Sequence, residues 1–184
     1  MTLSAARCSR KFLNFTLNMD VLLGVKMALS PLDMFKYSGV WYEVANVKSG
    51  IPLVCFDTRG LYEYDPDRDV MDVQLGCRQM GNRPTAVKGF MRCPVQKGLP
   101  VTCSVRFPNA PYVPPSMYRI LDTDYESYAL VEGADDKSFV QVLSRYERPG
   151  LRFIDLQKER LKEWGYDPDS VHISPVTISE PRLD

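Results

Sequence analysis

The side chains that most often bind metals or act as nucleophiles are sparse in this sequence. It contains a single histidine, His172, so a metal site built from several histidines is excluded. Because His172 lies close to the C-terminus, we also expect no catalytic set of nucleophile, histidine and acid. The five cysteines contain no CxxC pair, which argues against zinc. The sequence therefore predicts no metal and no cofactor other than a bound lipid or pigment.

Four of the cysteines fall where two short hairpins would bring them together. Directly opposed residues of a hairpin have position numbers with a constant sum, which the turn sets. A turn in "YDPDRD" places Cys55 about opposite Cys77, and a turn in "VQKGLP" places Cys93 about opposite Cys103. This pattern favours two disulfides and an oxidising compartment. Four buried free cysteines are the alternative, since free cysteine is often a small core residue.

The elements that must position these side chains are short strands. Fourteen prolines and eleven glycines break the chain into short pieces. From Tyr37 onward, about eight strands follow one another at a spacing of roughly 8–12 residues, with local connections. After "RPG" the period changes, because Leu151, Ile154, Leu161 and Trp164 recur at helical steps. We therefore expect an all-β fold with one helix. It is an eight-stranded antiparallel up-and-down β-barrel, a C-terminal amphipathic helix and a short final strand in "SVHISPVTI".

Three short motifs occur in order along the chain. The first, "SGVWYEVA", contributes Gly39, Trp41 and Tyr42; the second, "LDTDYESYALV", contributes Asp122, Thr123, Asp124 and Tyr125; the third, "VLSRYERPG", contributes Arg145. Together they resemble the signature motifs of the lipocalin family, over roughly residues 31–176. The resemblance implies a calyx in which Arg145 lies over Trp41 at the closed end of the barrel. Both residues are then structural, and neither binds the ligand.

Function is implied by the same resemblance. Within the family, "VRFPNAPYVPPSMYRILDTDYESYALVEGADDKSFVQVLSR" and "LKEWGYDPDSV" resemble the plastid group of plants, itself similar to apolipoprotein D and bacterial lipocalins. This implies binding of a small hydrophobic ligand, such as a fatty acid, a lipid peroxidation product, a carotenoid or a sterol. It also implies the thylakoid lumen and protection of its membranes, with a secreted or periplasmic setting as the fallback. The 23 basic and 23 acidic side chains balance, so nucleic acid is not an expected partner.

Residues that line the calyx follow from alternation along the strands. The predicted ligand-binding side chains are Tyr62, Tyr64, Phe90, Met117, Tyr128 and Phe139. On the first strand, Glu43, Ala45 and Val47 share the parity of Trp41 and are expected to face inward. A slip of one residue in the register would exchange the two faces of any strand.

Two other functions use the same barrel. One is an enzyme like the xanthophyll de-epoxidases, with acid catalysis by groups such as Glu43 and Tyr62. The chain lacks the Cys-rich N-terminal region and acidic tail of that family, so we expect no enzyme. The other is a structural subunit of a thylakoid membrane complex, with a barrel filled by its own side chains. Its contacts would be the apolar loop "FPNAPYVPP" and an N-terminal extension.

The expected domain organisation is simple. Residues 1–30 form a basic, hydroxyl-rich leader or docking arm for a photosynthetic complex, residues 31–176 a lipocalin domain, and residues 177–184 a loose tail.

Overall fold

The computed structural model describes residues 31–48, 55–111, 115–133 and 139–176, so the expected leader and tail lie outside it. The elements are α1 (Met34–Tyr37), β1 (Gly39–Lys48), β2 (Phe56–Asp65), β3 (Val70–Gln79), β4 (Arg83–Arg92), β5 (Val101–Arg106), β6 (Ser116–Thr123), β7 (Tyr128–Gly133), β8 (Phe139–Ser144), α2 (Leu151–Leu161), η2 (Lys162–Trp164), η3 (Pro168–Ser170) and β9 (His172–Ile173). None of the helices in this part of the chain is long and apolar enough to span a membrane.

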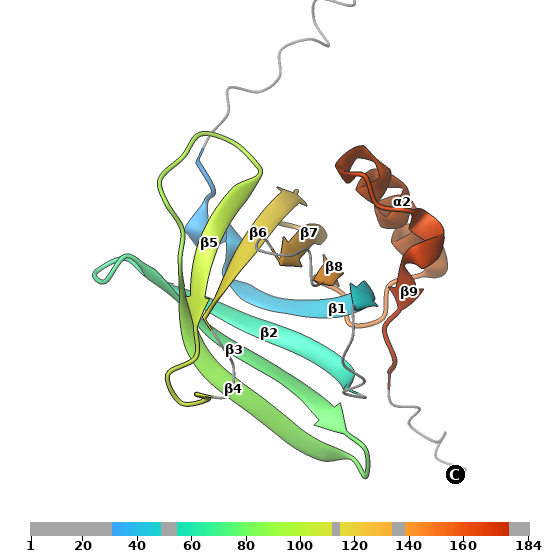
Figure 1. The fold of residues 1–184 in the computed structure, drawn as a ribbon, viewed down its shortest axis with the longest axis horizontal. Helices are drawn as coiled ribbons and strands as arrows, with labels where there is room; N and C mark the ends of the chain where they lie inside the picture. Colours follow the sequence, from blue (N-terminus) through green and yellow to red (C-terminus); the bar gives the residue numbers. More distant parts are fainter. Residues whose placement is uncertain (1–30, 49–54, 112–114, 134–138, 177–184) are drawn as a thin grey trace, which may run out of the picture.

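The strands form one closed antiparallel barrel, as the spacing of the turns predicts. Neighbours follow the order β2-β3-β4-β5-β6-β7-β8-β1, and pairing of β1 with β2 closes the sheet. The predicted helix is α2, which lies against the outside of the barrel beside β7 and β8 (Figure 1). The predicted final strand is β9, which pairs with the second half of β1. Strands β2, β3 and β4 are long and extend past the shorter strands (Figure 1).

The inward and outward faces of β1 exchange part-way along the strand. Trp41 belongs to the interior cluster, and Glu43 lies two residues further on the same face. A β-bulge then adds Val44 to β1 between the pairs that Glu43 and Ala45 make with β8. Ala45 and Val47 consequently pack on the outside of the barrel, in the cluster that contacts α2. Their expected inward orientation is wrong, because the bulge shifts the alternation by one residue.

Two apolar layers hold the fold together. The interior cluster lies on the inside of the barrel and draws on every strand from β1 to β8. The outer cluster lies between the barrel wall and α2, where Ile154 and Leu161 are buried and Trp164 is partly buried. Leu151 is 65% exposed, so the apolar stripe expected on the helix does not extend to its first residue. Helix α2 thus covers the outside of the wall and contributes no side chain to the interior cluster, whereas Tyr37 of α1 belongs to it.

Both predicted disulfides are present in the structure. Cys55 is bonded to Cys77 and Cys93 to Cys103, with Cα–Cα distances of 5.5 and 4.2 Å. Each bond joins the two arms of one hairpin, β2–β3 or β4–β5, as the constant-sum argument predicts. The alternative of four free cysteines is wrong.

Candidate ligand-binding site

One end of the barrel is closed by Arg145, which follows the last residue of β8. Its guanidinium carbon lies 3.6 Å from the ring centroid of Trp41. The guanidinium donates hydrogen bonds to the backbone oxygens of Lys36 (2.8 Å), Ser38 (2.9 Å), Val40 (3.0 Å), Tyr125 (3.1 Å) and Tyr37 (3.3 Å). At Gly39, φ is +107° and a Cβ would lie only 3.0 Å from Nη1 of Arg145, so glycine is required there. These contacts tie the start of the barrel to its end, and we call this the closed end.

The second sequence motif shapes the turn between β6 and β7 at the same end. The Asp124 carboxylate accepts hydrogen bonds from the backbone N–H groups of Glu126, Ser127 and Tyr128 and from the Ser127 hydroxyl. Partial burial raises the pKa of Asp124, but the four hydrogen bonds together lower it by more than burial raises it. The pKa of Asp124 therefore lies below the ordinary value. Thr123 donates its hydroxyl to the Tyr128 carbonyl. The motif residues therefore bind backbone and carry no obvious ligand group.

The inside of the barrel is apolar. Its buried side chains include Met71, Val73, Met91, Val105, Ile120, Val131 and Leu143. Away from the closed end, the interior side chains Leu75, Val87 and Phe139 are only partly buried. We call this end the open end. The β5–β6 connection begins there, and its residues Phe107 and Ala110 are buried in the interior cluster.

Three of the six predicted ligand-binding residues face this interior. Tyr62 is buried in the interior cluster, and Tyr64 and Phe139 pack against it. Phe139 lies 6.5 Å from the ring of Tyr118, centroid to centroid. Tyr64 turns its hydroxyl away from the interior, to the exposed carboxylate of Asp69 at 2.8 Å. Tyr62 and Phe139 are therefore the two predicted residues best placed to touch a ligand.

The other three predicted residues lie on the outer face of the barrel. Tyr128 packs in the outer cluster, where its hydroxyl donates to Asp122 at 2.6 Å. The guanidinium of Arg92 stacks on Phe90, 5.3 Å from the ring centroid, and Met117 lines a small surface hollow. The prediction that these three side chains face the interior is wrong. In each strand the side chain that faces inward belongs to the next residue along the chain. Their neighbours Met91, Tyr118 and Ala129 take the inward positions instead.

Two tyrosines that the alternation argument missed complete a polar cluster inside the barrel. The hydroxyl of Tyr118 lies 3.1 Å from that of Tyr37 and 3.4 Å from that of Tyr62. We call these three residues the tyrosine cluster. Burial is the main cause that raises the pKa of all three phenols, so they stay protonated at neutral pH. Gly60 makes room for the ring of Tyr62, since a Cβ there would lie 2.5 Å from it. Tyr37 precedes the first strand, so no periodicity could have assigned it to the interior.

A second polar group joins the barrel to the C-terminal segment. The Glu43 carboxylate accepts hydrogen bonds from Asn46 Nδ2 (2.7 Å), Gln141 Nε2 (2.5 Å) and Ser174 Oγ (2.8 Å). Asp57 at the start of β2 donates its N–H to the Pro175 carbonyl. Residues 174–175 thus lie between β1 and β2 where the two strands diverge. Glu43 therefore links β1 to β8 and to the C-terminal segment by hydrogen bonds, which is a structural role.

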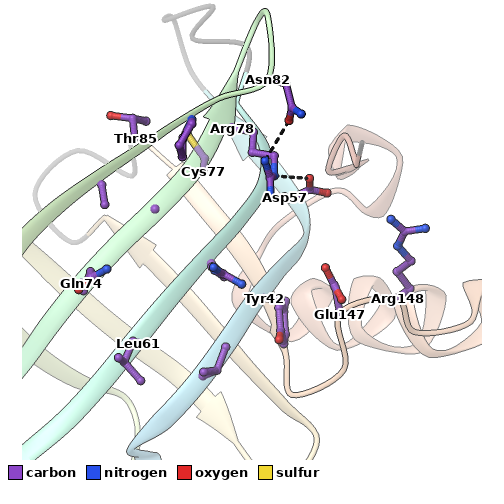
Figure 2. Close-up of a pocket in the computed structure, with 15 residues that line it drawn as sticks. Tyr42, Asp57, Leu61, Gln74, Cys77, Arg78, Asn82, Thr85, Glu147 and Arg148 are labelled. Atoms are coloured by element: carbon purple, nitrogen blue, oxygen red, sulfur yellow. Dashed lines mark hydrogen bonds and ion pairs between the residues drawn. The ribbon is translucent and has the colours of Figure 1, made fainter. Parts of the chain in front are cut away.

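A surface hollow with a volume of about 870 Å³ lies outside the barrel (Figure 2). Its floor is the outer face of β1 to β4, where Tyr42, Leu61 and Gln74 point outward, and Glu147 and Arg148 form one edge. This outer groove is polar as well as apolar and open to solvent. A long apolar molecule would be covered less there than inside the barrel, so the interior is the better candidate site.

Comparison with known proteins assigns the family. The family model described as a lipocalin-like domain matches residues 32–176. The chain belongs to the lipocalin family. It is 34% identical over 170 residues to the chloroplastic lipocalin of Arabidopsis thaliana, covering 81% of this chain and 48% of that protein. It is 29% identical over 162 residues to temperature-induced lipocalin-1 of the same plant, covering 82% and 83%. The chain thus spans about half the length of the first relative.

Solved structures of other lipocalins share the fold. Lobster apocrustacyanin A1 superposes with a TM-score of 0.61 at 17% identity, covering 78% of this chain and 79% of that one. Insecticyanin from the tobacco hornworm Manduca sexta gives 0.62 at 16% identity, with 82% and 84% covered. These likenesses show that the barrel fold is shared.

Proposed function

We propose that this protein binds and sequesters a small hydrophobic molecule inside its barrel, as a carrier or scavenger and not as an enzyme. The observation that carries the proposal is the apolar interior, closed by Arg145 at one end and only partly covered at the other. Such an interior supplies the dry, concave, mostly apolar wall that buries a long apolar ligand. Its driving force is on the order of 25 cal/mol per Å² of apolar surface removed from water.

The proposed setting is the chloroplast, and within it the thylakoid lumen, where binding of lipids or pigments would protect the membranes. Similarity to a chloroplastic lipocalin supports the organelle. Two disulfides are in keeping with an oxidising compartment. The proposal includes no metal and no resident cofactor.

The first test is native mass spectrometry of the protein isolated from its own source, followed by lipid extraction of any bound mass. We expect a co-purifying carotenoid, sterol or fatty-acid derivative at up to one copy per chain. A mass that stays attached to partner proteins would instead support the structural subunit of a membrane complex.

The second test locates the site with two neighbouring residues of β4. Val87 faces the interior at the open end, whereas Ala86 is exposed on the outer groove. We expect Val87→Trp to weaken binding of the apolar fluorophore N-phenylnaphthylamine by about tenfold or more, because the indole occupies the interior. Ala86→Trp should leave the affinity unchanged. The opposite result would place binding in the outer groove and refute the proposal.

A further inference from the structure

The tyrosine cluster has one hydrogen-bond donor more than it uses. Three hydroxyls carry three O–H protons. Their two mutual contacts, Tyr37 to Tyr118 and Tyr62 to Tyr118, consume two of those protons whichever oxygen donates. Among the described residues these hydroxyls make no other hydrogen bond. One O–H group inside the barrel therefore has no protein acceptor, and a buried donor of this kind gains from any acceptor that reaches it.

The three residues of the tyrosine cluster differ slightly in their exposure to solvent. Tyr37 is 0% exposed, Tyr62 4% and Tyr118 9%. Phe139, partly buried at the open end, packs near the ring of Tyr118. A molecule that enters past Phe139 thus meets Tyr118, the central residue of the cluster, before Tyr37 and Tyr62.

The surroundings favour an uncharged acceptor. The residues that pair with Tyr62 and Tyr118 across the sheet include Val73, Cys103 and Gly133, none of them basic. The guanidinium of Arg145 is turned to backbone carbonyls at the closed end. A carboxylate placed on the cluster would lose its hydration, and the guanidinium of Arg145 already bonds backbone carbonyls, so the transfer is costly in an apolar interior.

We propose that the tyrosine cluster selects ligands that carry a neutral oxygen acceptor, a ketone, aldehyde, ether or alcohol, over both hydrocarbons and fatty-acid anions of equal chain length. This inference rests on the proposed binding function and names the ligand class of the same site. The phenol protons donate to the ligand oxygen while the chain packs against the apolar wall. Since burial keeps all three phenols protonated, the donor is present throughout the neutral pH range.

The test compares methyl decyl ketone, lauryl alcohol, laurate and dodecane as competitors of bound N-phenylnaphthylamine. In the unmodified protein we expect the ketone and the alcohol to bind about fivefold to tenfold more tightly than dodecane and laurate, the effect of one buried hydrogen bond. The variant Y37F/Y62F/Y118F removes every hydroxyl of the cluster together and leaves no orphaned partner. It should bind the ketone about fivefold more weakly and dodecane within about twofold of the unmodified protein.

Tyr146→Phe is the matched control, because Tyr146 is 60% exposed outside the barrel and should change none of these affinities. A second readout needs no variant: the infrared carbonyl stretch of the bound, isotopically labelled ketone should lie below its position in dodecane. Equal affinities for ketone and dodecane, an unshifted carbonyl band, or tighter binding of laurate would each overturn the inference while leaving the binding function intact. If the fluorophore itself does not bind, the proposed function fails and this inference with it.

Discussion

Removal of the Arg145 side chain should destabilise the fold before it affects ligand binding. In Arg145→Ala the backbone oxygens of Lys36, Ser38 and Val40 lose the bonds that the guanidinium donates at 2.8 to 3.0 Å. The face of Trp41 loses its cation at 3.6 Å. None of these contacts lies on the part of the interior where we place the ligand.

The magnitude follows from counting these contacts. Arg145 is only partly buried, so water replaces part of each lost bond, and we assign about 1 kcal/mol to each of the three shortest. The cation–π contact adds about 1 kcal/mol. The total of about 4 kcal/mol is a large fraction of the roughly 5–15 kcal/mol that stabilises a typical domain. For a chain of this size it lowers the melting temperature by about 8–16 °C.

The assay is thermal unfolding followed by circular dichroism, together with fluorophore binding well below the midpoint. Arg152→Ala is the control, because Arg152 is exposed on α2 and its loss should cost less than about 0.5 kcal/mol. Arg145→Lys keeps the charge but not the planar fork, so it should recover less than half of the loss. An unchanged melting temperature with weakened binding in Arg145→Ala would refute the structural role.

Four further perturbations test other parts of the structure. Replacing Cys93 and Cys103 by serine opens a bond that spans 10 residues and should cost on the order of 2–3 kcal/mol in urea unfolding. Asp124→Asn should cost about 1–2 kcal/mol at pH 7, and the difference from the unmodified protein should vanish as the pH falls below about 4. The reason is that the folded-state pKa of Asp124 lies below the ordinary value, so its stabilisation is present above that value and lost on acidification. Tyr118→Phe should cost about 2 kcal/mol, more than the triple phenylalanine variant, because it leaves two buried hydroxyls without a partner. Stability of the unmodified protein should also fall as the pH rises above about 10, since the phenol pKa values are raised in the folded state.

The barrel, the helix and both disulfides could be predicted from the sequence because each depends on local signals. Turn residues set the spacing of the strands, and the constant sum of opposed positions pairs Cys55 with Cys77 without any knowledge of the tertiary structure. The contact between Trp41 and Arg145 could also be predicted. Trp41 lies near the start of the first strand and Arg145 directly after the eighth, and the two strands are neighbours in a closed barrel.

The lining of the interior could not be predicted as well, because it depends on parity. Val44 forms a bulge that no composition signal marks, and it turns Ala45 and Val47 outward. Phe90 and Met117 were chosen for their size, but one residue of register separates each from the side chain that faces inward. Alternation gives two faces for every strand and cannot say which of them is the inside.

The polar groups of this barrel divide into two kinds, and the division explains why the motifs reveal the family and not the ligand. At the closed end, Arg145 and Asp124 bond mainly to backbone groups, so their task is to hold the fold together. Inside, the hydroxyls of the tyrosine cluster bond only to one another among the described residues, and one O–H proton has no acceptor. That remaining O–H group is available to a ligand oxygen. Ligand specificity is therefore to be tested at the hydroxyl of Tyr118, which lies outside all three sequence motifs. The stability of the fold is to be tested at Arg145, which belongs to the third motif.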